Sequence, residues 1–157
     1  MNFVNLSLPG AGIIKLSPAE DERGVFTKLF NRSPGLPTIA EVNHSFTRHK
    51  GTVRGMHYQV APAQETKIVK CLSGRIHDVI IEVSTGRYLR TELSCDDNKM
   101  LYVPEGYAHG FQTLEDNTVV LYLSSQHYDP YLERGINHNV VDWPLPVTYI
   151  SKKDAAL

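Results

Sequence analysis

The stretch TKIVKCLSGRIHDVIIEV, residues 66–83, decides the fold class of this chain. It holds two runs rich in β-branched residues on either side of a Ser-Gly pair, a pattern typical of two short strands joined by a turn. Comparable runs follow at 99–103, 109–114 and 118–125, each set off by polar turn residues. Evenly spaced short strands without long helical periodicity predict an antiparallel β-sandwich or jelly roll.

Length and composition predict one globular domain, spanning residues 1–157. Its 41% hydrophobic content is enough to fill a single core. The net charge of −1, without a basic block, argues against a nucleic-acid binder. No apolar run could span a membrane and no signal pattern begins the chain, so we expect a cytoplasmic protein. We expect Cys71 and Cys95 to be buried, reduced thiols.

The final residues, SKKDAAL at 151–157, predict a short helix. Ser151 is the expected N-cap, and Asp154 falls at the capping-box position three residues later. The ordinary interpretation of Asp154 is therefore a capping side chain at a surface terminus. Within the strand at 66–72, alternation puts Lys67 and Lys70 on opposite faces. One of these lysines must point inward, where it needs a partner or a wet cavity.

The histidine of RGMHYQ, His57, has three interpretations: a packed strand residue, a metal ligand, or a base. The spacing P-x-G-x-x-H that ends at His109 resembles the second signature of the cupin jelly-roll superfamily. HYQ followed by Glu65 resembles a degraded form of the first signature. A metal-dependent cupin could use His57, Glu65 and His109 as ligands. Gln59 stands where such proteins carry a further histidine, and an amide is a poor ligand for a transition metal.

Many motifs, in matching order, resemble the dTDP-4-dehydrorhamnose 3,5-epimerase family of nucleotide-sugar epimerases. The resemblance implies an all-β, cupin-type double-stranded β-helix with a short C-terminal helical segment, acting without a metal or other cofactor. It implies a nucleoside-diphosphate 4-keto-6-deoxyhexose as substrate, in deoxysugar and lipopolysaccharide O-antigen biosynthesis. It also implies a homodimer that exchanges N-terminal strands. The matching stretches include DERGVFTKLFN (21–31), VNHSF (42–46), RGMHYQ (54–59), PEGYAHGF (104–111), ERGI (133–136) and SKKDA (151–155).

An epimerase next to a ketone needs a base at the carbon, a positive group at the oxygen, and an acid on the opposite face. By resemblance, His57 is the base and Asp154 orients it. Lys67 lies near the C4 oxygen, and Tyr128 delivers a proton on the other face. Further substrate-binding positions, also by resemblance, are Arg23, Phe26, Asn43, Arg54, Gln59, His109 and Tyr122.

Several positions depart from the family pattern. Lys28 stands where relatives commonly have glutamate, and Glu41 and Val42 replace glutamine and aspartate. The segment EVSTGRYLRTEL (82–93) and the residues after Asp154 are shorter than usual. These departures touch recognition, so the nucleotide (dTDP, CDP or GDP) and the inverted carbon (C3, C5 or both) stay open. The alternatives are a metal-dependent cupin enzyme, a non-catalytic sugar-nucleotide binding module, and a related cupin ketoisomerase.

Overall fold

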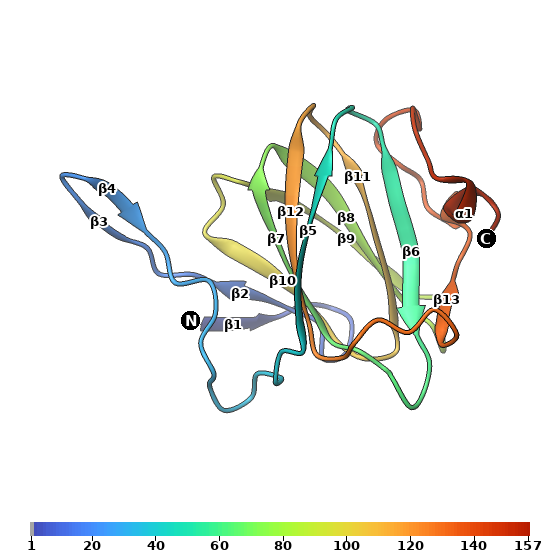
Figure 1. The fold of residues 1–157 in the computed structure, drawn as a ribbon, viewed down its shortest axis with the longest axis horizontal. Helices are drawn as coiled ribbons and strands as arrows, with labels where there is room; N and C mark the ends of the chain where they lie inside the picture. The colour runs from blue at the N-terminus through green and yellow to red at the C-terminus, as the bar shows by residue number, and fades with distance from the viewer. Residues whose placement is uncertain (1) are drawn as a thin grey trace.

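Two antiparallel β-sheets pack face to face in the computed structural model, which describes residues 2–157 (Figure 1). The sheets have the strand orders β1-β2-β10-β7-β12-β5 and β13-β6-β11-β8-β9, and β3 and β4 form a separate hairpin. The predicted all-β antiparallel architecture is confirmed. The strands are β1 Asn2–Asn5, β2 Gly12–Lys15, β3 Ala19–Asp21, β4 Gly24–Phe26, β5 Glu41–Thr47, β6 Val53–Gln59, β7 Lys67–Ser73, β8 Arg75–Glu82, β9 Tyr88–Ser94, β10 Lys99–Val103, β11 Tyr107–Thr113, β12 Thr118–Ser124 and β13 Glu133–Gly135, followed by a 3-10 helix at His138–Val140 and helix α1 at Lys152–Ala155.

The main apolar core lies between the two sheets and draws side chains from both. Val69, Leu101 and Val120 come from the six-stranded sheet, and Ile80 and Phe111 come from the five-stranded sheet. Each of the five is at most 1% exposed. Burial of such a side chain is worth about 1.5–3 kcal/mol, so this packing fixes the separation of the sheets. A fixed separation also fixes the shape of any cavity between them.

The C-terminal segment covers the outer face of the five-stranded sheet before it returns to β6. Val141 and Trp143 pack there against Val79 of β8. Helix α1 then lies beside β6, and Figure 1 shows the C-terminus on that side of the molecule. This course brings the last residues of the chain next to the middle of the sequence.

The predicted C-terminal helix and its N-cap are confirmed. The Ser151 hydroxyl accepts a hydrogen bond from the Asp154 backbone N–H at 3.0 Å. The Asp154 side chain does not complete a capping box, because its carboxylate is turned toward β6. The helix therefore holds Asp154 by its backbone and leaves its carboxylate free for another partner.

The two strand lysines and the two cysteines differ in their surroundings. Lys67 faces a cavity, while Lys70 is buried on the other face of β7 and donates to the carbonyls of Asp97 (2.6 Å) and Ser94 (3.4 Å). Cys71 is a buried free thiol, as predicted. The prediction for Cys95 is wrong: this thiol is exposed, because it follows β9 in a turn.

The β3–β4 hairpin stands away from both sheets in Figure 1. All six of its strand residues are exposed, including Val25 (61%) and Phe26 (69%). The rest of residues 2–157 therefore leaves the apolar side chains of this hairpin exposed. Among the described residues, no helix is long and apolar enough to cross a membrane.

Candidate active site

A cavity of about 790 Å³ lies between the two sheets. Strands β6 and β11 form one wall, and β5, β7 and β12 form the facing wall. The loop after β12 and the segment around α1 contribute to the rim. Of the eleven residues predicted from the sequence, nine line this cavity: Asn43, Arg54, His57, Gln59, Lys67, His109, Tyr122, Tyr128 and Asp154.

His57 and Asp154 form a hydrogen-bonded pair across 97 residues of sequence, with Nε2 of the imidazole 3.0 Å from Oδ1 of the carboxylate. The other carboxylate oxygen accepts the Gly55 backbone N–H at 3.1 Å. Burial by itself raises the pKa of Asp154, but the hydrogen bonds from His57 and Gly55 outweigh it and hold the pKa below its usual range. An ionised Asp154 fixes Nε2 as a donor, so Nδ1 is the nitrogen free to receive a proton.

Gly55 is required where it stands. Its φ of +119° is unfavourable for a residue with a side chain. A Cβ at Gly55 would also lie 2.5 Å from the Cα of Gly110 and 2.7 Å from the carbonyl oxygen of His109. The close approach accompanies a bulge in the β6–β11 pairing, where His57 stays opposite His109. The glycine thus allows two histidines to lie side by side.

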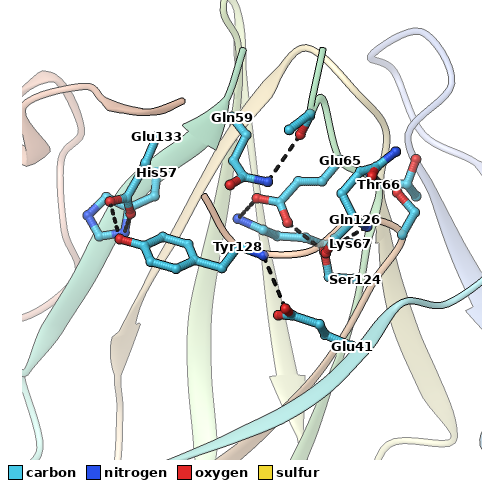
Figure 2. Close-up of polar contacts among 12 residues, drawn as sticks. Glu41, His57, Gln59, Glu65, Thr66, Lys67, Ser124, Gln126, Tyr128 and Glu133 are labelled. Carbon is cyan, nitrogen blue, oxygen red and sulfur yellow. Dashed lines mark hydrogen bonds and ion pairs between the residues drawn. The ribbon is translucent and has the colours of Figure 1, made fainter. Parts of the chain in front are cut away.

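Glu133, on β13, lies at the edge of the cavity beside His57 and Tyr128 (Figure 2). Its Oε1 lies 3.3 Å from Nδ1 of His57, and its Oε2 accepts the Tyr128 hydroxyl at 2.9 Å and also contacts Lys153. Burial raises the pKa of Glu133, but the hydrogen bonds from Lys153 and Tyr128 lower it further than that. His57 therefore has a carboxylate beside each ring nitrogen.

Lys67 projects into the cavity from the facing wall. Its ammonium lies 2.9 Å from Oε1 of Glu65, and Oε2 of Glu65 accepts the Ser124 hydroxyl at 2.5 Å (Figure 2). The Lys67 and Glu65 side chains are 18% and 11% exposed. The strand thus presents an ammonium group, held by the Glu65 carboxylate, to whatever occupies the cavity.

Tyr122 and His109 lie near each other on opposite walls, with ring centroids 6.4 Å apart. The Tyr122 hydroxyl shares a hydrogen bond with Ser45 at 2.9 Å, and burial raises its pKa to about 12. His109 Nε2 lies 3.0 Å from both oxygens of the buried Asp78 carboxylate. Tyr122 is therefore a protonated phenol in the cavity, and Asp78 fixes which nitrogen of His109 faces away from the cavity.

Three other predicted residues use their polar atoms to organise the walls. Gln59 donates to the carbonyls of Ala63 and His127 and accepts the Asp129 N–H at 2.6 Å, so it anchors two loops. Arg54 donates to the hydroxyl of Thr47 at 3.0 Å. Asn43, on β5, donates from its side-chain amide to the Glu41 carboxylate at 3.2 Å.

Glu41 brings a negative charge to the cavity rim, as its position in the sequence suggested. Its carboxylate accepts the Tyr128 backbone N–H at 3.1 Å and the Asn43 amide at 3.2 Å. These bonds lower the pKa of Glu41, so it is ionised at neutral pH. The charged Glu41 carboxylate therefore also holds the loop that carries Tyr128.

Arg23 and Phe26 do not reach the cavity of their own chain. Both belong to the projecting β3–β4 hairpin and its turn, and Arg23 forms an exposed ion pair with Asp21 at 2.6 Å. The sequence motif DERGVFTKLFN identifies these residues as binding candidates, but it does not indicate whether they line the cavity of their own chain or that of a second copy. The hairpin geometry leaves them without a role inside a single protomer.

The metal-site hypothesis for His57, Glu65 and His109 is not supported by their partners. His57 is held by Asp154, Glu65 by Lys67, and His109 by its own buried aspartate. Within residues 2–157, no three histidine, cysteine, aspartate or glutamate side chains converge as a metal site would require.

Sequence reasoning missed Glu133, Asp78 and Ser45. Glu133 was part of the ERGI motif, yet nothing in the sequence indicated that β13 pairs with β6 and sets Glu133 opposite Gln59. Asp78 interrupts an apolar strand run, and a buried charge in such a run could have indicated a partner. No pattern in the sequence indicated that Ser45 contacts the Tyr122 hydroxyl.

Similarity searches connect the whole chain to one family. Residues 5–157 match the profile of the family described as dTDP-4-dehydrorhamnose 3,5-epimerase. A protein of that name from Sinorhizobium fredii is 33% identical over 171 residues, covering 99% of this chain and 88% of the relative.

Solved structures show the same fold. The crystal structure of dTDP-4-dehydrorhamnose 3,5-epimerase from Sulfolobus tokodaii aligns with a TM-score of 0.91 and 39% identity, over 98% of this chain and 91% of that one. ChmJ, a 3'-monoepimerase from Streptomyces bikiniensis in complex with dTDP-quinovose, aligns with a TM-score of 0.85 and 26% identity, over 96% and 84%. The predicted cupin-type jelly roll is confirmed by this agreement.

Proposed function

The chain belongs to the dTDP-4-dehydrorhamnose 3,5-epimerase family, and we propose that His57 is the base of its reaction. Family membership makes it an isomerase that epimerises a nucleoside-diphosphate 4-keto-6-deoxyhexose in deoxysugar biosynthesis. The observation that carries the proposed role is the His57–Asp154 pair, which opens onto the cavity between the sheets. Nδ1 of His57 would take the proton from the carbon beside the C4 ketone.

The two carboxylates beside His57 support this role electrostatically. Proton abstraction converts the neutral imidazole into an imidazolium, and both ring N–H groups then have an acceptor in Asp154 and Glu133. If the two carboxylates stabilise His57 more as positive charge develops on its ring, they lower the activation barrier of proton abstraction and do more than tighten substrate binding. When the sugar carbon approaches Nδ1 of His57, the Glu133 carboxylate must move away from this nitrogen or remain beside it together with the carbon.

Lys67 would stabilise the enolate oxygen formed at C4. A fixed cation lowers the energy of an oxyanion more than that of the neutral ketone. His109, close to Tyr122 in the cavity, would supply a second contact near the carbonyl group.

The acid on the opposite face is Tyr122 in this proposal, in place of the Tyr128 expected from the sequence. Tyr128 and His57 both contact the Glu133 carboxylate, so they approach the cavity from the same side. Tyr122 belongs to the six-stranded sheet, which faces the sheet of His57, and it lies inside the cavity. A sugar held between the sheets would have His57 on one face and Tyr122 on the other.

The proton balance of one inversion is simple. The C–H proton moves to His57, leaving an enolate whose oxygen faces Lys67. The Tyr122 hydroxyl then gives its proton to the opposite face of the same carbon, and the ketone re-forms. His57 ends protonated and Tyr122 ends as a phenolate, and exchange with solvent restores both. The same groups could serve C3 or C5, because both carbons flank the C4 ketone.

The substrate we propose is dTDP-linked, as the names of the family and of the relatives indicate. The cavity lining holds four carboxylates but two permanent cations, counted over the described residues. Such a lining attracts a diphosphate poorly, so further positive charge must come from outside the protomer.

A homodimer with exchanged N-terminal strands would supply that charge. Arg23 and Phe26 are exposed on a hairpin that projects from its own protomer, and a partner's cavity could receive them. A guanidinium suits diphosphate oxygens because it donates two parallel hydrogen bonds. The cytoplasmic location expected from the sequence stays a prediction.

The proposed function is tested by a substrate panel in deuterium oxide. The 4-keto-6-deoxy sugars of dTDP, CDP and GDP are incubated with enzyme, and mass spectrometry counts the deuterons gained. We expect enzyme-dependent uptake with the dTDP compound in preference to the others. One deuteron would indicate a monoepimerase and two a 3,5-epimerase, while no uptake with any nucleotide would contradict the proposal.

A further inference from the structure

Glu65 and Lys67 form an ion pair that faces the cavity rather than the outer solvent (Figure 2). The pair is closed by Ser124, whose hydroxyl lies 2.5 Å from the second oxygen of Glu65. That length is typical of a hydroxyl donating to an ionised carboxylate. Both oxygens of Glu65 therefore have a partner: one contacts the Lys67 ammonium, and the other accepts the hydroxyl of Ser124 on the neighbouring strand β12.

The strand geometry explains why these three side chains meet. Lys67 is paired with Ser124 across the β7–β12 ladder, so the two share a face. The two chains stay together one residue further: the Thr66 N–H donates to the Ser125 hydroxyl at 2.8 Å, and the Ser125 N–H donates to the Thr66 carbonyl at 3.0 Å. Alternation then puts Glu65, two residues before Lys67, on the same face.

The pairing has a consequence for the lysine. A lysine ammonium is a mobile point charge on a four-carbon stem, with three donor hydrogens. The carboxylate of Glu65 uses one hydrogen and limits the directions of the other two. The Lys67 side chain is 18% exposed, and without Glu65 its ammonium would be free to turn toward other acceptors in the cavity. Among these is the Glu41 carboxylate at the rim.

We propose that Glu65 is a positioning residue for the epimerase reaction: it holds the Lys67 ammonium where the C4 oxygen becomes an enolate. This inference rests on the proposed role of Lys67. Glu65 acts through the lysine and need not touch the sugar. The carboxylate occupies one ammonium hydrogen, which leaves two for the oxygen, and the ion pair is neutral before the enolate forms.

The test compares Glu65→Gln with Glu105→Gln, which makes the same change on an exposed turn outside the cavity. Deuterium uptake by the dTDP-linked substrate gives kcat and KM for each variant. We expect Glu65→Gln to lower kcat by about tenfold with KM changed less than about threefold, because positioning matters most in the transition state. Glu105→Gln should match the wild type in both constants.

A double-mutant cycle with Lys67→Met separates positioning from a general structural effect. If Glu65 acts through Lys67, adding Glu65→Gln to Lys67→Met should change kcat by less than about twofold. Equal losses in both backgrounds, or an unchanged kcat in Glu65→Gln, would overturn the inference. An unchanged kcat in Lys67→Met would instead overturn the proposed role of Lys67.

Ser124→Ala provides a second route if Glu65→Gln folds poorly, as judged by circular dichroism. It removes one anchor of Glu65 and keeps both charges. We expect a smaller loss of kcat, about threefold, that also disappears in the Lys67→Met background. A loss that persists in that background would contradict the inference.

Discussion

At the scale of single residues, the site is organised around one imidazole with a carboxylate beside each ring nitrogen. Asp154 holds Nε2 and Glu133 lies beside Nδ1. In the proposed reaction, both ring N–H groups would have a carboxylate acceptor once the ring has taken a proton. The groups on the facing wall, Lys67 and Tyr122, are a cation and a protonated phenol. In the proposed reaction, one wall therefore carries the base, and the facing wall carries the cation and the acid.

Asp154 should make stability depend on acid pH. Its pKa is lower in the folded protein than the value of about 3.9 in an unfolded chain, so the ionised group stabilises the fold at neutral pH. The contribution is fully present above the unfolded value and is lost as pH falls through the folded pKa. Asp154→Asn should cost about 1–3 kcal/mol of unfolding free energy at pH 7.

Urea unfolding of the wild type and Asp154→Asn at several pH values checks this. The gap between the two proteins should be the same at about pH 7 and pH 5 and should narrow toward about pH 3. A gap that stays constant down to the lowest pH would mean that the Asp154 carboxylate does not have the lowered pKa.

The two tyrosines should respond differently to removal of their hydroxyls. Tyr122→Phe should lower inversion by about 10²–10³-fold while solvent exchange on the His57 side continues, because the base is untouched. Tyr128→Phe should change deuterium exchange and inversion by a similar factor, because Tyr128 acts through the Glu133 carboxylate beside His57. Measurement of inversion and deuterium uptake in one sample separates these outcomes. Selective loss of inversion in Tyr128→Phe would restore the assignment expected from the sequence.

At the scale of elements, strand β6 and helix α1 bring His57 and Asp154 together. The β6–β11 bulge requires Gly55 and sets His57 beside His109. Helix α1 is one turn long, too short to be stable without its tertiary contacts. The hydrogen bond from the Asp154 N–H to its N-cap, Ser151, therefore helps to position Asp154.

Ser151→Ala should lower both stability and activity. Loss of the cap leaves the Asp154 N–H without its acceptor and costs about 1 kcal/mol. Because Asp154 orients His57, kcat should fall more than KM rises. Ser84→Ala, an exposed serine in the turn after β8, is the matched control. Full activity in a destabilised Ser151→Ala protein would show that the helix cap is not needed to hold Asp154.

The sequence predicts local elements well and long-range contacts poorly. Turn residues and β-branched runs located β10 at 99–103 exactly as found and β12 to within one residue. Ser151 was found as the cap because capping is a local rule. Glu133 and Asp78 were missed because their value comes from strand pairing. The depth of Tyr122 relative to Tyr128 follows from their places in the fold, because Tyr122 lies within β12 and Tyr128 lies in the loop after it.

At the scale of the whole molecule, the projecting hairpin is the feature that one protomer does not explain. An exposed Phe26 and a distant Arg23 fit a site completed by a second copy. In such an assembly each cavity would combine the catalytic pair of one chain with the hairpin of its partner. Activity would then require association.

Subunit mixing tests this arrangement. His57→Ala and Arg23→Ala proteins should each be nearly inactive alone, and the mixture should recover about a quarter of wild-type activity, because half of the dimers are mixed and each has one intact site. Light scattering of the wild type should give a dimer mass. A monomer mass, or a mixture no more active than its components, would contradict the exchanged dimer.

The central claim is that His57 removes a proton from the carbon beside the ketone. Proton NMR of the dTDP-linked 4-keto-6-deoxy sugar in deuterium oxide tests this most directly. The wild-type enzyme should replace the C3 or C5 proton signal with deuterium, and His57→Ala should lower that rate by about 10²–10⁴-fold while the nucleotide still binds. Exchange at the wild-type rate in His57→Ala, with the same fold and affinity, would contradict the account.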